Sequence, residues 1–125
     1  NMNIILLIIL VLLVLYYSMV KEKFTPIGFD EDYLLVMYYT EWCGYSQQAL
    51  PQFVGVGNMY QTKRNKGVKL LALDCDKHGA DCRKADIRGY PTIILYKKND
   101  ASFVREYKGA RSTIAITSWV EKNAN

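Results

Sequence analysis

The chain has 125 residues, of which 50% are hydrophobic, and it carries a formal net charge of +4. This length leaves room for one small globular domain with a single core. The basic residues are scattered and form neither a basic run nor a nucleic-acid-binding motif, so no nucleic-acid partner is expected.

The N-terminal segment from Ile4 to Val20 contains no charged residue. Its length is at the short end of what spans a bilayer, and two tyrosines near its end fall where an interfacial aromatic belt would lie. We therefore predict a transmembrane signal-anchor helix over residues 1–20, a linker over 21–32 and a folded domain over 33–125. A cleaved signal peptide is the alternative, although no Lys or Arg precedes the run and no small-x-small cleavage site follows it.

Strand and helix patterns alternate over the remaining residues. Residues 33–39 and 68–73 are apolar runs typical of strands that are buried on both faces. A helical pattern begins at or next to Cys43 and contains Pro51, which predicts a kink. The other predicted elements are a helix over 80–87 closed by Gly89, strands over 92–96 and 102–107 joined by a turn at Asn99 and Asp100, and a last helix capped by Ser112.

This alternating order predicts an α/β fold. The sheet is expected to be mostly parallel and covered by helices on both faces, because strands joined through helices run in the same direction. The turn at Asn99 and Asp100 adds one antiparallel pair at the end of the domain.

Trp42, Cys43 and Gly44 lie where a buried strand is expected to pass into a helix. A cysteine at this junction points its sulfur at the unpaired N–H groups of the helix and at the positive end of the helix dipole. Both features favour the thiolate, which is the nucleophile of thiol–disulfide exchange, and predict a pKa below the ordinary value of about 8.5. A buried structural cysteine is the alternative interpretation.

The stretch from Tyr33 to Ser46, with its Trp-Cys-Gly-Tyr-Ser motif, resembles the active-site region of thioredoxins and of the redox-active domains of protein disulfide isomerases. Pro51 matches the proline inside the active-site helix of that family. Residues 88–92 (Arg-Gly-Tyr-Pro-Thr) are similar to the loop whose cis proline lies against the active-site sulfur, and Gly109 and Arg111 match the stretch before the last helix. The resemblance implies a thioredoxin-like three-layer sandwich, in which helices flank a mixed sheet.

The resemblance also implies one active site, with Cys43 as the attacking thiol. The catalytic positions that it implies are Cys43, Ser46, Pro91 and Arg111. The substrate groove that it implies consists of Trp42, Gly44, Tyr45 and Tyr90. No cofactor and no metal are expected at this site.

The sequence departs from the family at three places. Ser46 replaces the second active-site cysteine, so Cys43 is expected to act as a monothiol that exchanges disulfides or holds a client covalently. Met37 stands where the family has a buried acidic residue that aids proton transfer. Only residues 21–32 lie between the predicted anchor and the first strand, which predicts a domain trimmed of the strand and helix that usually open this fold.

Cys75 and Cys82 resemble a second, structural cysteine pair of some isomerase domains. The resemblance implies a disulfide and therefore an oxidising compartment, such as the secretory lumen, the periplasm or the cell exterior. There are two alternatives. One is a metal site built from Cys75, His78 and Cys82, and the other is a pair of free thiols in a cytosolic domain.

Three functions are compatible with these features. The first is a membrane-anchored thiol-exchange protein that acts on client proteins with cysteines. The second is a non-catalytic structural or interaction protein of a membrane complex or a virus particle. The third follows from a similarity to monothiol glutaredoxins, whose Cys-Gly-Phe-Ser motif binds an iron–sulfur cluster with glutathione, but Trp42 and the loop around Pro91 disfavour it.

Overall fold

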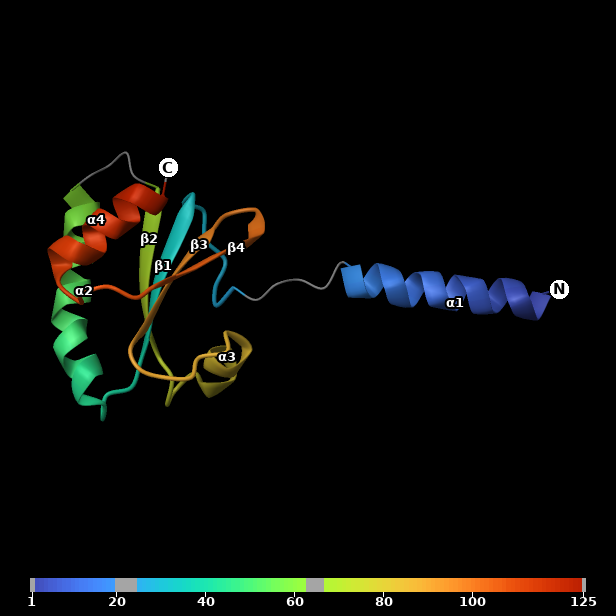
Figure 1. Ribbon diagram of the computed structural model, residues 1–125, viewed down its shortest axis with the longest axis horizontal. Coiled ribbons are helices and arrows are strands. Elements are labelled where there is room, and N and C mark those ends of the chain that lie inside the picture. Colours follow the sequence, from blue (N-terminus) through green and yellow to red (C-terminus); the bar gives the residue numbers. More distant parts are fainter. Residues whose placement is uncertain (1, 20–24, 63–66, 125) are drawn as a thin grey trace.

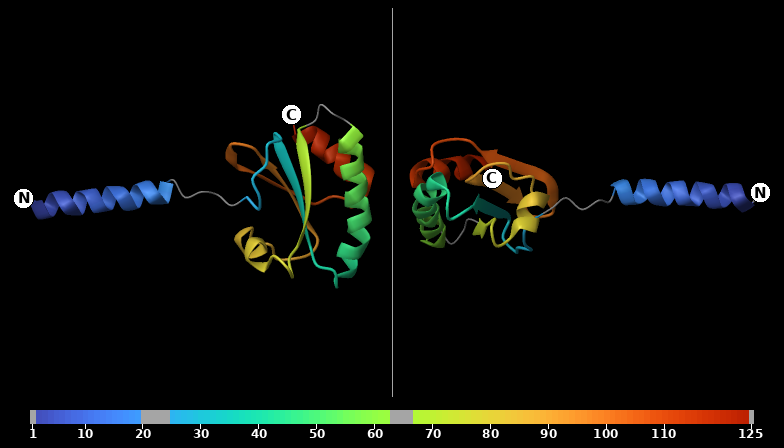
Figure 2. Two further views of the ribbon diagram at one scale, coloured as in Figure 1. Left: turned by 180° about the vertical axis from the view of Figure 1, so that it is seen from behind. Right: turned by 90° about the horizontal axis from the view of Figure 1, so that it is seen from below.

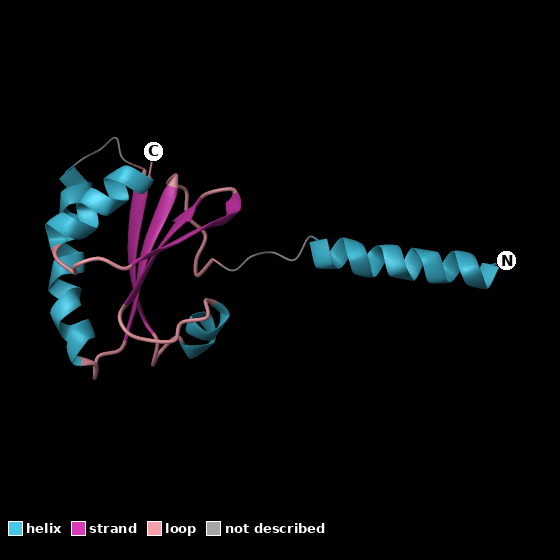
Figure 3. Cartoon of the chain, viewed as in Figure 1, coloured by secondary structure: helices cyan, strands magenta, loops and turns pink. Residues whose placement is uncertain are grey.

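The computed structural model describes residues 2–19, 25–62 and 67–124 (Figure 1). Two helices, α2 and α4, cover one face of a four-stranded sheet, and α3 covers the other face (Figure 1). Figure 3 shows the same layers with helices and strands in separate colours. The elements are α1 (Met2–Met19), β1 (Tyr33–Tyr39), α2 (Gly44–Thr62), β2 (Val68–Asp74), α3 (Gly79–Lys84), β3 (Thr92–Lys97), β4 (Asp100–Tyr107) and α4 (Thr113–Asn123).

The sheet has the strand order β2-β1-β3-β4. β1 runs parallel to β2 but antiparallel to β3, and β3 runs antiparallel to β4. The mixed sheet implied by the family resemblance is therefore confirmed, whereas the mostly parallel sheet predicted from the order of elements is wrong. Apolar runs identify buried strands, but they carry no information about the direction in which a strand enters the sheet.

The central strand β1 supplies side chains to both faces of the sheet. Because successive side chains of a strand point to opposite faces, β1 divides the core into two clusters. The odd-numbered residues from Tyr33 to Met37 pack against α2 and α4. The even-numbered residues from Leu34 to Tyr38 pack in the cluster that contains the α3 cysteine. All six are at most 6% exposed, as the uniformly apolar run predicts.

Helix α2 continues through Pro51 and packs closely on α4. A Cβ atom placed on Gly55 would lie 2.6 Å from Oγ1 of Thr113 at the start of α4. The Thr113 hydroxyl donates a hydrogen bond of 2.9 Å to the backbone carbonyl of Gln52. Gly55 therefore lowers helix propensity but permits the close crossing that fixes the two helices to each other.

The short helix α3 ends earlier than predicted. It stops at Lys84, and the chain leaves it through Asp86, whose φ of 57° lies in the left-handed region. Gly89 does not close the helix, because it has no positive φ. Aspartate is one of the residues that adopt this conformation at low cost, so Asp86 takes the role that the sequence pattern assigned to glycine.

The predicted turn and the predicted last helix cap are both confirmed. Asn99 has a φ of 60° in the hairpin between β3 and β4. The Ser112 hydroxyl accepts a hydrogen bond of 3.2 Å from the backbone N–H of Ala115, so Ser112 is the N-cap of α4. Local side-chain chemistry determines both features, which makes them readable from the sequence.

Helix α1 stands apart from the sheet in all views (Figure 2), and its side chains from Met2 to Ser18 are exposed. None of the helices in the described ranges meets the length and hydropathy required of a bilayer span. The predicted transmembrane helix is thus not found.

The segment between α1 and β1 is only partly described. Residues 21–24 of the predicted linker lie outside the described residues. Residues 25–32 form neither a helix nor a strand. Among the described strands, β2 pairs only with β1 and forms one edge of the sheet.

Candidate active site

Cys43 lies at the junction between the β1 end of the sheet and helix α2. Its backbone carbonyl accepts a hydrogen bond of 3.0 Å from Gln47 N–H, which places Cys43 directly before the first turn of the helix. The Cys43 thiol lies 3.6 Å from the backbone carbonyl oxygen of Tyr90 and is oriented to donate to it. The side chain is partly exposed, so the sulfur is held between the helix N-terminus and the Tyr90 loop while remaining accessible.

The surroundings of Cys43 lower the pKa of its thiol, as the sequence predicts. The backbone N–H of Ser46 makes the largest contribution, and the partial burial of the sulfur opposes it. The backbone N–H of Tyr45, the Ser46 hydroxyl and the positive charge of Arg111 add to the lowering. Helix N–H groups stabilise the negative sulfur because they have no partners within the helix.

Ser46 lies beneath the active-site loop rather than on its surface. The residue is fully buried, and its hydroxyl accepts a hydrogen bond of 3.4 Å from the backbone N–H of Thr40. Met37, where the family has an acid, is also fully buried and packs in the apolar cluster under α2. Residue 46, which the resemblance equates with the second active-site cysteine, thus carries a buried hydroxyl, and residue 37 supplies no carboxylate.

The loop before β3 contains a cis proline directly after Tyr90, whose carbonyl oxygen faces the Cys43 sulfur. The Tyr90–Pro91 peptide bond is cis, as the resemblance implies, and Pro91 is buried. The Thr92 hydroxyl donates a hydrogen bond of 2.7 Å to the Gly89 carbonyl, which closes the loop. The Tyr90 ring meets Trp42 edge-on, with 6.0 Å between the ring centroids. This contact joins the two segments that flank Cys43.

The expected groove residues lie around the sulfur on the surface. Trp42 is 67% exposed and Tyr45 is 65% exposed, although both are large aromatic residues. The Arg111 guanidinium lies over the Tyr45 ring, 5.7 Å from its centroid. Gly44 begins α2, and outside its chain neighbours and the nearby helix backbone no heavy atom lies within 4 Å of the site of a Cβ. The structure thus brings every predicted site residue to one end of the sheet.

Several residues of this region were not predicted from the sequence. The Gln47 side-chain amide donates a hydrogen bond of 2.8 Å to the Glu41 carbonyl and so closes the loop that carries Cys43. A cleft of about 580 Å³ runs from the Tyr90–Pro91 loop to Arg111 and is also lined by Asp86, Arg88, Val104 and Glu106. Asp86 and Arg88 are distant in sequence from Glu106 on β4, so no local pattern could have grouped them.

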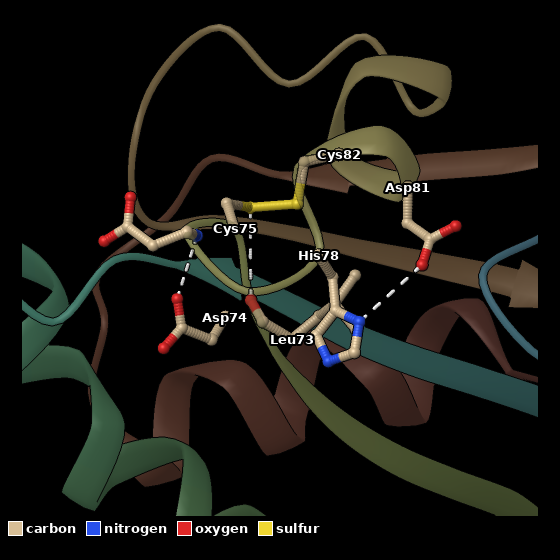
Figure 4. Close-up of polar contacts among 7 residues, drawn as sticks. Leu73, Asp74, Cys75, His78, Asp81 and Cys82 are labelled. Carbon is tan, nitrogen blue, oxygen red and sulfur yellow. Dashed lines mark hydrogen bonds and ion pairs between the residues drawn. A yellow bond between two sulfur atoms is a disulfide. The ribbon is translucent and has the colours of Figure 1, made fainter.

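The Cys75–Cys82 pair forms a disulfide, which confirms the pairing implied by the resemblance (Figure 4). The two Cα atoms are 5.7 Å apart, and the residues are 7% and 4% exposed. His78, between the two cysteines in sequence, has its Nδ1 atom 4.0 Å from the Asp81 carboxylate (Figure 4). Both cysteine sulfurs are held in the bond, so the free-thiol and metal-ligand interpretations of this pair are wrong.

Comparisons with known proteins agree with this geometry. Protein disulfide-isomerase of Aspergillus oryzae is 29% identical over 107 residues, which cover 86% of this chain and 20% of that protein. Protein disulfide isomerase-like 2-2 of Oryza sativa subsp. japonica is 34% identical over 86 residues, which cover 69% of this chain and 22% of that protein. The chain therefore spans about a fifth of the length of these curated relatives.

Solved structures show the same fold. Human ERp44 in its zinc-bound form superposes with a TM-score of 0.68 at 28% identity, over 76% of this chain and 28% of that chain. The first thioredoxin domain of mouse Protein disulfide-isomerase A4 superposes with a TM-score of 0.65 at 25% identity, over 77% of this chain and 66% of that chain. The family model described as Thioredoxin matches residues 16–122, which include Cys43, the cis-proline loop and Arg111, and the chain therefore belongs to the thioredoxin family.

Proposed function

We propose that this chain is a thiol–disulfide exchange protein whose Cys43 forms mixed disulfides with client proteins. The observation that carries the proposal is the partly exposed Cys43 sulfur at the N-terminus of α2, where its pKa is lowered. The thiolate attacks one sulfur of a client disulfide, a new S–S bond forms as the old one breaks, and the departing sulfur keeps the electron pair and takes a proton.

The buried Ser46 determines how such a reaction ends. A hydroxyl forms no disulfide, so the chain has no second sulfur next to Cys43 with which to displace the client. The resolving thiol must come from the client or from another molecule. We propose that the protein isomerises non-native disulfides or holds clients covalently, in contrast to a dithiol oxidase or reductase.

The aromatic side chains around the sulfur supply a contact surface for clients. Trp42 and Tyr45 expose rings next to Cys43, and Tyr90 lies against Trp42. Exposed apolar groups of this kind mark binding sites, because removing them from water on binding lowers the free energy. An unfolded client segment with apolar residues near its cysteine fits this surface.

The proposal is tested by the rate at which the reduced Cys43 thiol reacts with 2,2′-dipyridyl disulfide, a neutral probe whose released thione is coloured. We expect the folded protein to react faster at pH 7 than the same chain unfolded in urea, since folding lowers the thiol pKa. Cys43→Ser is the control and should show no reaction. Equal rates in the folded and unfolded chain would contradict the proposal.

One observation favours a second candidate function. Met37 is buried where the family has an acid that aids proton transfer, and a module that only binds other proteins needs no such group. The second candidate is a non-catalytic thioredoxin-fold protein of a membrane complex or a virus particle. A folded Cys43 that reacts no faster than an unfolded cysteine would support it.

We also propose that the domain lies in an oxidising compartment, such as the secretory lumen, the periplasm or the cell exterior. The support is the buried Cys75–Cys82 disulfide, since disulfides persist where thiols are not kept reduced. Differential alkylation and mass spectrometry of the protein from its native source tests this. We expect Cys75 to be joined to Cys82, with Cys43 free or in a mixed disulfide. Three unmodified thiols would contradict an oxidising compartment.

We propose finally that α1 attaches the domain to a membrane. The helix has no charged residue, and its apolar side chains from Met2 to Leu15 are 46–78% exposed. An apolar surface of this extent requires a cover, which lipid provides. Flotation with phospholipid vesicles should recover the full chain but not a chain lacking residues 2–19. Equal recovery of the two chains would contradict membrane attachment.

A further inference from the structure

The cleft beside the cis proline contains one cation that has no carboxylate partner among the described residues. Four charged side chains line this cleft, namely Asp86, Arg88, Glu106 and Arg111. Arg88 pairs with Asp86 through two contacts of 3.3 Å. Glu106 pairs with Lys108, whose ammonium nitrogen is 3.7 Å from the Glu106 carboxylate. Within the described ranges, no carboxylate lies within ion-pair distance of Arg111.

Arg111 also lies close to the reacting sulfur. Its guanidinium stands over the ring of Tyr45, two residues after Cys43. It lines the same cleft as Tyr90, whose carbonyl oxygen is 3.6 Å from the Cys43 sulfur. The charge of Arg111 also contributes to the lowered pKa of Cys43. One side chain thus connects the cleft, the exposed aromatic surface and the attacking thiol.

We propose that Arg111 makes Cys43 select disulfides that carry a carboxylate near the reacting sulfur, so that preferred clients have Asp or Glu next to their cysteine. This inference rests on the proposed exchange activity and adds a client preference to it. Arginine suits the role, because its planar guanidinium presents two parallel N–H donors to a carboxylate and stacks on an aromatic face. The Tyr45 ring limits the positions of the guanidinium and so reduces the entropy lost on binding.

The carboxylate takes no part in the covalent step. Cys43 thiolate attacks the client sulfur nearest to the bound carboxylate, one S–S bond forms, one S–S bond breaks, and the departing sulfur leaves as a thiol after protonation. The ion pair with Arg111 is made on approach and persists in the mixed disulfide. Removing Arg111 should therefore slow the reaction with anionic disulfides more than the reaction with neutral ones.

The test compares two small disulfides, 5,5′-dithiobis(2-nitrobenzoate), which carries carboxylates, and 2,2′-dipyridyl disulfide, which is neutral. The ratio of their rates cancels the thiolate fraction of Cys43, so a change in its pKa alone does not move the ratio. For Arg111→Gln we expect the ratio to fall about two- to fivefold, as is typical for the loss of an exposed ion pair. The rate ratio of Arg111→Lys should lie between those of the unmodified chain and Arg111→Gln, because a lysine keeps the charge but loses the paired donors.

A matched control removes the same charge from another face of the domain. Arg105 is exposed on β4, and its guanidinium lies 4.9 Å from the Phe103 ring centroid. Side chains alternate along a strand, so Arg105 faces away from the cleft that its neighbour Glu106 lines. Arg105→Gln should leave the rate ratio unchanged. A fall equal to that of Arg111→Gln would show a general effect of net charge and overturn the proposal.

A second arm identifies the source of the carboxylate. Two peptide disulfides that differ only in Glu or Gln next to the cysteine are compared with glutathione disulfide, which carries carboxylates of its own. Faster reaction of the Glu peptide, lost in Arg111→Gln, supports acidic clients. A preference confined to glutathione disulfide, or an unchanged probe ratio with a fast neutral reaction, overturns the client preference alone. A slow neutral reaction overturns the proposed exchange activity as well.

Discussion

Two cysteine sites lie beyond the carboxyl ends of the parallel strands β1 and β2. Tyr39 and Asp74 pair at those ends, and Cys75 N–H donates a hydrogen bond of 2.8 Å to the Tyr39 carbonyl. After β1 the chain enters α2 on one face of the sheet with Cys43 at its start, and after β2 it enters α3 on the other face. One sulfur is left accessible and acidic, whereas the other two are bonded and buried.

The difference shows that the surroundings of a sulfur determine its role. Cys43 faces helix N–H groups and a positive charge, which stabilise a thiolate. Cys75 and Cys82 lie in an apolar cluster with Leu73 and Ile94, and their sulfurs are bonded to each other. We therefore expect changes at the first site to alter mainly the reactivity of the thiol, and changes at the second to alter mainly the stability of the fold.

The largest expected effect is on the rate of client release in Ser46→Cys, which places a second thiol next to Cys43. A second sulfur next to Cys43 would displace a bound client by an intramolecular reaction, whose effective molarity far exceeds that of external thiols. We expect release of a mixed disulfide at least about a hundredfold faster, measured by quenched-flow mass spectrometry. Ser46→Ala is the control and should leave release at the rate of the unmodified chain.

A failure of Ser46→Cys to accelerate release would contradict the proposed exchange site. The same variants should be unfolded in urea, since residue 46 is fully buried and a change there can disturb the fold. Similar unfolding midpoints would show that the missing acceleration reflects the site rather than the stability of the domain.

The second effect is a loss of stability in the double variant Cys75→Ala, Cys82→Ala, which lacks the disulfide. Closing a loop over a sequence separation of 7 stabilises the fold by about 2.5 kcal/mol in the chain-entropy model, so the free energy of unfolding should fall by about that amount. Urea denaturation measures it. The reaction of Cys43 with the neutral disulfide should be unchanged in the folded variant. Loss of that reaction would show that the two sites are coupled.

The third effect is a pH dependence confined to Cys43. Because folding lowers its pKa, alkylation by iodoacetamide should rise with pH around a midpoint lower than that of the urea-unfolded chain. The unfolded chain binds more protons in the window between the two midpoints, so this group favours the folded state increasingly as pH rises through that window. Arg111→Gln should move the folded midpoint upward, and coincident folded and unfolded midpoints would contradict the site.

The smallest effect is expected in the cluster beside the disulfide. The hydroxyls of Tyr38 and Tyr96 are 2.6 Å apart and buried, and burial raises the pKa of both phenols, which therefore stay protonated. Tyr38→Phe should lower the free energy of unfolding by about 1 kcal/mol, because the Tyr96 hydroxyl loses this partner. Replacing both tyrosines by phenylalanine should cost less than the sum of the single changes. Strict additivity would contradict the hydrogen bond.

Features that depend on neighbouring residues were predictable from the sequence. The apolar run of β1, the helix that starts after Cys43 and the cap at Ser112 follow from hydrophobic pattern and cap chemistry. The position of Cys43 before a helix also predicted its lowered pKa. The disulfide and the cis proline came from the family resemblance instead.

Features that depend on distant segments were not predictable in this way. The antiparallel pairing of β1 with β3 is fixed by how the chain returns from α3, and no residue pattern within β3 records it. Arg88 and Glu106 of β4 line the same cleft although they are far apart in sequence. A side chain at Gly55 would clash with Thr113 on another helix. The predicted bilayer span rested on hydropathy, and the helix that forms was not found long and apolar enough to cross.

The oxygen at Ser46 has a kinetic consequence for any client bound at Cys43. In the proposed exchange reaction, the time for which a client stays bound is set by how often a thiol of the client or of another molecule reaches the mixed disulfide. The partial burial of Cys43 restricts the approach of such a thiol further. Where the resolving thiol comes from another molecule, the rate of client release would rise with the thiol concentration of the surroundings.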